Sequence, residues 1–204
     1  MASLFHTLLS SSFSMLALLL CICLSVESAI IPSITTDKEA LISFKETLLN
    51  APPSLSWDQN SSPCSNWTGV VCRNDGQSPR VVGLDLSSLG LTGTISPQIG
   101  NLSFLRSLRL QNNKLTGAIP TQLVNLYRLR SLNLSSNTIQ GQLPSNMSNL
   151  NALEVLDLAG NNMTGRLPCQ TATSVARGSS LYRYCPNLTT FKVLGFNHKR
   201  PRYN

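Results

Sequence analysis

The stretch LRSLRLQNNKLTGAIP, Leu105 to Pro120, spaces its leucines in a way that suits neither a long helix nor an isolated strand. The same spacing returns at a constant period of two dozen positions, as LRSLNLSSNTIQGQLP from Leu129 and LEVLDLAGNNMTGRLP from Leu153. An earlier copy, VVGLDLSSLGLTGTIS, starts at Val81, and no insertion separates the four copies. Agreement at so many positions indicates a structural repeat.

This spacing predicts the fold. A period of 20–29 residues with the pattern L-x-x-L-x-L-x-x-N is typical of leucine-rich repeats. The alternating leucines can point inward from a short strand while their neighbours point to the other, concave face, and successive strands can pair in a parallel sheet about 4.8 Å apart. The amides of Asn113, Asn137 and Asn161 can satisfy buried backbone groups where the chain leaves each strand, whereas Leu89 holds this place in the first copy. We predict an α/β solenoid, a right-handed leucine-rich repeat superhelix, with four repeats over residues 81–168.

The start of the chain indicates export. From Leu8 to Val26 the residues are almost all apolar or small, and Val26 and Ser28 are small residues suited to cleavage, so residues 1–28 are predicted to be a secretory signal peptide. No Lys or Arg precedes Lys38, which leaves an uncleaved anchor as the alternative. No later apolar run reaches about 18 residues, so no membrane span is expected beyond the signal segment.

Residues 36–78 are predicted to form a helical amino-terminal cap. Thr36 and Glu39 fit a capping box, and the helix that follows places Leu41, Phe44 and Leu48 on one face. The aromatic residues of this segment would cover the exposed end of the repeat stack; they are Trp57 and Trp67.

Four of the six cysteines lie after the predicted signal, and four cysteines allow three pairings. We favour Cys64 with Cys72 and Cys169 with Cys185, which puts one disulfide at each end of the array, where a solenoid would otherwise expose its core. For the second pair, two unpaired thiols in a loose tail remain the alternative.

Residues 169–204 depart from the repeat and carry the charge. They contain no acid and six of the 16 basic residues, so the formal charge of +7 belongs mainly to this segment. The register predicts apolar residues where Arg177, Ser180 and Tyr182 stand. We predict a basic tail or an irregular cap; the alternative is an imperfect fifth strand near Leu188. No base-stacking array or DNA-binding motif accompanies the basic residues, so no nucleic-acid partner is expected.

The sequences SPCSNWTGVVC and VVGLDLSSLGLTGTISPQIGNLSFLRSLRLQNNKLTGAIP closely resemble the extracellular regions of plant leucine-rich repeat receptor kinases, above all the branch that includes receptors for bacterial patterns. The resemblance covers about residues 36–168. It implies a curved solenoid that binds a peptide or a partner ectodomain, with no cofactor and no chemistry of its own. Members of the family continue through more repeats, a membrane helix and a kinase that this sequence does not contain, so we expect a truncated ectodomain or a fragmentary gene product.

If the concave sheet is the binding surface, the outward strand positions are the candidate ligand contacts. They are Asp85, Ser107, Arg109, Gln111, Ser131, Asn133, Ser135 and Asp157. The opposite charges of Asp85 and Arg109 are expected to face each other across neighbouring strands. A simple solvated surface is the alternative for each of these residues.

Seven N-x-S/T sequons fit an exported surface protein. Six are predicted glycosylation sites: Asn60, Asn66, Asn101, Asn146, Asn162 and Asn187. The seventh, Asn133, lies among the outward strand positions, where a glycan would block the concave face, so we expect it to stay bare.

The function predicted from these features is recognition without catalysis. The only histidine after the signal is His198, and no nucleophile motif, phosphate loop or metal-spaced cluster appears. A peptide or a receptor-kinase ectodomain is the expected partner, in defence or developmental signalling. The alternatives are a secreted inhibitor of microbial wall-degrading hydrolases such as polygalacturonase, or a fragment with no independent role. The expected location is extracellular or the cell wall, or the plasma membrane if the signal is retained or the chain belongs to a longer receptor.

Overall fold

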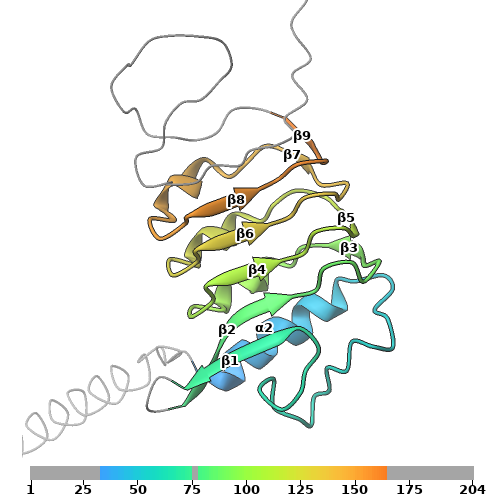
Figure 1. The fold of residues 1–204 in the computed structure, drawn as a ribbon, viewed down its shortest axis with the longest axis vertical. Helices are drawn as coiled ribbons and strands as arrows, with labels where there is room; N and C mark the ends of the chain where they lie inside the picture. Colours follow the sequence, from blue (N-terminus) through green and yellow to red (C-terminus); the bar gives the residue numbers. More distant parts are fainter. Residues whose placement is uncertain (1–32, 75–77, 165–204) are drawn as a thin grey trace, which may run out of the picture. The chain divides into compact units, whose positions relative to one another are not determined.

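The computed structural model describes residues 33–74 and 78–164. Its main element is a five-stranded sheet that runs along the repeats (Figure 1). The strands, in spatial order, are β1 (Val70–Asn74), β2 (Pro79–Asp85), β4 (Ser107–Arg109), β6 (Ser131–Asn133) and β8 (Val155–Asp157).

The register of the parallel strands equals the sequence period. Leu84 pairs with Leu108, Leu108 with Leu132 and Leu132 with Leu156, so each leucine lies beside its equivalent in the next copy. These four side chains are at most 2% exposed. The predicted leucine-rich repeat solenoid is therefore confirmed, because identical positions of successive copies stack on one another.

Short 3-10 helices lie in the return segments of the first three repeats, and they contact one another in sequence order. They are η1 (Pro97–Asn101), η2 (Thr121–Asn125) and η3 (Ser145–Asn149). Two small parallel sheets lie where the chain leaves the main strands, one formed by β3 (Thr92–Thr94) and β5 (Lys114–Thr116), the other by β7 (Gln140–Gly141) and β9 (Asn162–Met163).

Three buried asparagines connect the coils, as the sequence predicts. Asn137 Oδ1 accepts from Leu115 N at 3.0 Å, while Nδ2 donates to the carbonyls of Leu110 at 2.9 Å and Leu134 at 3.0 Å. Asn113 and Asn161 repeat this arrangement. In the first copy, where Leu89 replaces the asparagine, the Leu89 N–H donates to Asn113 in the next coil.

The cap begins with helix α2 (Ile34–Glu46), which packs against η1 and β2. The capping box predicted at Thr36 and Glu39 is wrong: it lies one turn earlier, where Ser33 is the N-cap and Thr36 Oγ1 accepts from the Ser33 N–H at 2.9 Å. The actual pair uses a threonine in place of the usual Glu or Gln at the third position, which hides it from the sequence motif.

The rest of the cap closes the end of the leucine core. Trp57 and Trp67 stack with ring centroids 5.5 Å apart, and both belong to the same buried cluster as the repeat leucines. Cys64 and Cys72 form the predicted disulfide. β1 then pairs antiparallel with β2 and adds an outer strand that the repeat period does not predict.

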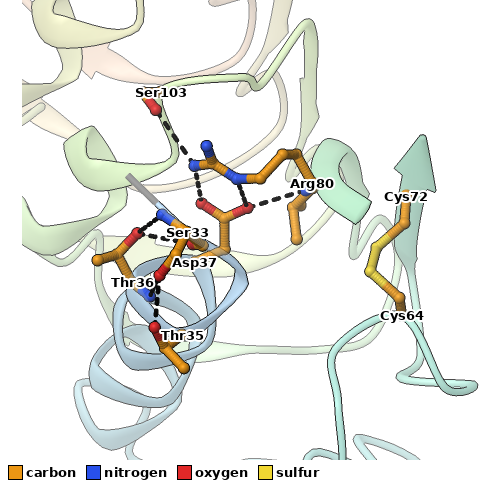
Figure 2. A network of polar contacts seen from close by, with 9 residues as sticks. Ser33, Thr35, Thr36, Asp37, Cys64, Cys72, Arg80 and Ser103 are labelled. Carbon is orange, nitrogen blue, oxygen red and sulfur yellow. Dashed lines mark hydrogen bonds and ion pairs between the residues drawn. A yellow bond between two sulfur atoms is a disulfide. The ribbon is translucent and has the colours of Figure 1, made fainter. Parts of the chain in front are cut away.

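Cap and repeats are joined by a buried ion pair that the sequence motifs miss (Figure 2). Asp37 in the first turn of α2 accepts from Arg80 in β2 and from the Val81 N–H. Gly93 provides a second junction: a Cβ there would lie 2.2 Å from the Thr47 carbonyl oxygen, so only glycine allows the cap backbone this close.

Several predictions lie outside the described residues: the signal peptide at 1–28, the tail at 169–204, the pairing of Cys169 with Cys185, and the sequon at Asn187.

Candidate functional site: the outer sheet face

The side of the five-stranded sheet opposite the leucine core is the surface that the sequence predicts to be concave, and we call it the outer sheet face. The strand register aligns its side chains in rows across the strands. One row consists of Asp85, Arg109, Asn133 and Asp157; a second contains Gly83, Ser107, Ser131 and Val155. Gln111 and Ser135 lie two residues beyond the first row in their own repeats. The structure therefore aligns six of the eight predicted residues in two rows, and the Ser135 hydroxyl contacts Asn133 in the first row.

Asp85 and Arg109 form the expected pair across β2 and β4, with Arg109 Nη1 3.6 Å from Asp85 Oδ2. Partial burial raises the pKa of the Asp85 carboxyl, but hydrogen bonds from the Ser87 side chain and N–H, together with Arg109, outweigh it and hold the pKa below its ordinary value. Asp85 is therefore charged at neutral and mildly acidic pH. Because both side chains are about half exposed, the ion pair itself contributes little to stability.

Local hydrogen bonds orient the row. Asn133 Oδ1 accepts from the Ser135 N–H at 3.0 Å and from its hydroxyl at 2.7 Å. Asp157 Oδ1 accepts from the Ala159 N–H at 3.1 Å. Strands commonly end where a side-chain oxygen accepts a hydrogen bond from the N–H two residues further along the chain. This arrangement recurs in several of the repeats. Gln111 differs, since its Oε1 is buried without a hydrogen-bond partner within the described residues.

A pocket at the β1 end of this face is not evident from the repeat pattern. It has a volume of about 250 Å³ and is lined by Val71, Val82, Gly83, Asp85, Ser107 and Arg109, among others. Val71 comes from β1 and remains 56% exposed. Because β1 runs antiparallel and outside the repeat period, only the folded chain places Val71 beside Gly83.

Two further arginines border the face just before β4 and β6, and sequence reasoning overlooked both. The Arg106 N–H donates to the Val82 carbonyl and the Arg130 N–H to the Arg106 carbonyl, each at 2.8 Å, so these positions are aligned. Arg130 pairs with Glu154 at 3.4 Å. The repeat alignment could have revealed them, because the position after the first apolar residue of each repeat is Val, Arg, Arg and Glu in the four copies.

Most sequons in the described residues lie away from the outer sheet face. Asn60 and Asn66 are exposed in the cap, Asn101 and Asn146 are exposed on η1 and η3, and Asn162 is exposed on β9. Asn133 differs, because it is half-buried and its side-chain oxygen already accepts two hydrogen bonds. The predicted glycosylation sites in the described residues thus avoid the outer sheet face.

Residues 33–74 and 78–164 contain no cluster of three or more His, Cys, Asp or Glu side chains suited to a metal ion. Within the same ranges no helix is long and apolar enough to cross a membrane.

Comparison with known proteins agrees with this architecture. A profile described as leucine rich repeat N-terminal domain matches residues 34–73, and one described as leucine rich repeat matches residues 103–163. Among curated proteins, the LRR receptor-like serine/threonine-protein kinase EFR of Arabidopsis thaliana is 43% identical over 100 residues, which is 48% of this chain. The match spans only 9% of that receptor's length.

Two solved structures are similar over a larger share of their length. In the BIR3–SERK2 complex from Arabidopsis thaliana, the matching chain is 32% identical, with a TM-score of 0.59 over 65% of this chain and 72% of that one. The ectodomain of the receptor kinase SOBIR1 from the same plant is 34% identical, with a TM-score of 0.57 over 68% of this chain and 73% of its own. The chain thus belongs to the family of plant leucine-rich repeat receptor-kinase ectodomains.

Proposed function

We propose that this protein is a non-catalytic extracellular recognition module whose outer sheet face binds a peptide or the ectodomain of a receptor kinase. The observation that carries the proposal is the aligned row of Asp85, Arg109, Asn133 and Asp157 on a surface whose opposite side is a closed leucine core. Rigid strands hold these polar groups in fixed register, which favours specific binding. The solved BIR3–SERK2 relative is itself a complex of two proteins.

The spacing of the acidic groups supports binding rather than catalysis. Asp85 and Asp157 lie three strand spacings apart, about 14 Å, which exceeds the separation at which two carboxylates act together on one bond. Binding of a partner requires only an ordered polar surface such as the outer sheet face.

We further propose that the protein acts outside the cell, either secreted or at the plasma membrane. The disulfide between Cys64 and Cys72 supports this location, because such bonds persist in oxidising compartments. The proposed organisation is a signal at 1–28, a cap at 36–78, four repeats at 81–168 and a tail at 169–204, with Cys169 paired to Cys185.

A glycan placed on the outer sheet face tests the proposal. Arg109→Asn combined with Gln111→Thr creates a sequon in the middle of the polar row. Asn151→Thr creates one at Asn149, which ends η3 as the native sequon residue Asn101 ends η1, and serves as the matched control. Mass spectrometry of the secreted proteins verifies glycan occupancy.

Binding is then measured against immobilised receptor-kinase ectodomains and a fungal polygalacturonase. We expect a receptor ectodomain to bind the native chain and the control, and to lose binding to the face variant. Equal binding to both glycosylated variants contradicts the use of this face. Selective, glycan-sensitive binding to the polygalacturonase assigns the protein to the inhibitor class instead.

A further inference from the structure

The pocket beside β1 is small. Its volume of about 250 Å³ lies below the range of about 300–1,000 Å³ that is usual for small-molecule sites. Gly83 supplies no side chain in the row where the next strands carry Ser107, Ser131 and Val155, and Val71 lies over it, with its Cβ 3.2 Å from where a Cβ of residue 83 would stand. Val71 and Val82 form its apolar wall. An aliphatic side chain of a partner fits this lining.

The charges on the strands beyond the pocket are ordered. Asp85 lies on β2 at the rim; Arg106 and Arg109 belong to the β4 repeat; Arg130 precedes β6. In the described part of the β8 repeat, residues 153–164, the charged residues are both acids, Glu154 and Asp157. Moving away from the pocket, a ligand therefore meets a basic zone over β4 and β6 and then an acidic zone over β8.

An extended segment that crosses the strands matches this order. Such a segment advances about 3.3 Å per residue, and its same-facing side chains recur every second residue, about 6.6 Å apart, while neighbouring strands are about 4.8 Å apart. With residue i in the pocket at β2, residue i+2 lies between β4 and β6. Residue i+4 lies about 13 Å from residue i, close to β8, because four residues of extended chain span nearly three strand spacings.

We propose that the outer sheet face recognises an extended protein segment with an aliphatic residue at i, an acidic residue at i+2 and a basic residue at i+4. This inference rests on the proposed function and adds the chemical class of the partner. The aliphatic side chain fills the pocket. The acid joins Arg109 and Arg130, which already pair with Asp85 and Glu154, and the base joins Glu154 and Asp157. Reversed charges at i+2 and i+4 meet like charges, so the face selects by repulsion as well as attraction.

Synthetic nine-residue peptides test the pattern. The first has Leu-x-Glu-x-Lys in a Thr/Ser background, the second has the same three residues in reverse chain direction, and the third has Leu-x-Lys-x-Glu. Binding to the full secreted chain is measured by fluorescence anisotropy at low salt. One of the first two is expected to bind about fivefold more tightly than the charge-swapped third, the effect of two exposed charge pairs.

Variants separate the pocket from the charges. Val71→Ser removes the apolar wall at an exposed position and is expected to weaken binding about tenfold; Gly83→Val fills the pocket and should act in the same direction. Thr121→Val adds an apolar residue at an exposed position on η2, away from the outer sheet face, and should leave binding unchanged. Exchanging a charge pair, as Arg130→Glu with Glu154→Arg, should lower the preference over the charge-swapped peptide at least threefold.

The outcomes are decisive in both directions. Equal binding of all three peptides, no detectable binding at millimolar peptide, or full binding by both the Val71→Ser and Gly83→Val proteins overturns the proposed pattern. If the native chain binds none of these peptides, but a glycan at position 109 still abolishes binding to the receptor ectodomain, the proposed function stands and only this peptide pattern is wrong.

Discussion

Asp37 and Arg80 form a buried two-point ion pair between the cap helix and the first strand of the repeats. Arg80 Nε donates to Asp37 Oδ2 at 2.9 Å and Nη2 donates to Oδ1 at 2.7 Å, while the side chains of Asp37 and Arg80 are 0% and 4% exposed. The same carboxylate accepts from the Val81 N–H at 2.9 Å, and the Phe104 ring lies 4.1 Å from the guanidinium carbon. The junction thus satisfies both charges through direct contacts within the chain (Figure 2).

Replacing Asp37 by Asn should separate cap and repeats energetically. The amide keeps the shape but leaves the buried guanidinium without its counter-charge, a change that costs about 3–5 kcal/mol in comparable sites. Urea unfolding followed by circular dichroism measures the loss. Glu154→Gln, which breaks the exposed pair with Arg130, is the control and should cost at most about 1 kcal/mol. Similar losses in the two variants contradict a special role for the buried pair.

Asn137→Asp should break the connection between two coils. Aspartate keeps an acceptor for the Leu115 N–H but cannot donate to the carbonyls of Leu110 and Leu134. We expect a loss of at least about 2 kcal/mol in the free energy of unfolding, because buried carbonyls lose their donors and face a carboxylate. Asn125→Asp, at the exposed end of η2, should be nearly neutral. If both variants unfold at the same urea concentration, the buried amide is not what holds the coils together.

Leu132→Asp tests the inward assignment of the repeat leucines. Leu132 is 0% exposed between β4 and β8, so a charge there has no partner and should cost several kcal/mol. The neighbouring change Ser131→Asp places the same charge on the outer sheet face and should alter stability by about 0.5 kcal/mol or less. Thermal melting by circular dichroism compares them. A wild-type melting temperature for the Leu132 variant contradicts the solenoid core.

The depressed pKa of Asp85 predicts how its contribution depends on pH. Since the folded-state pKa lies below the unfolded value, the charged carboxylate stabilises the fold above the unfolded pKa, and this stabilisation disappears as the pH falls through the folded pKa. The gap in melting temperature between the native chain and Asp85→Asn should therefore be constant from neutral pH to about pH 5 and shrink in more acidic solution. A gap that widens on acidification contradicts the direction of the shift.

The repeats were predictable because each position stacks against the equivalent position of the next copy. Leu108 and Leu132 occupy the core for the same reason, and Arg109 meets Asp85 because equal positions of neighbouring strands must align. The burial of Trp57 and Trp67 followed from their place before the first repeat. The capping box was misplaced because Ser33 and Thr36 use a threonine hydroxyl where the motif expects a carboxylate or amide.

The repeat pattern is sufficient to predict the solenoid, its strand register and the identity of its polar face, because a hydrophobic period repeated without insertion permits one stacking of coils. The contacts that do not follow the period are seen only in the folded chain: Arg80 binds Asp37, 43 positions away in the sequence, and β1 folds back to place Val71 beside Gly83. These pairs have no copy elsewhere in the described chain. Their partners depend on how the cap packs against the first strand, which no local pattern encodes.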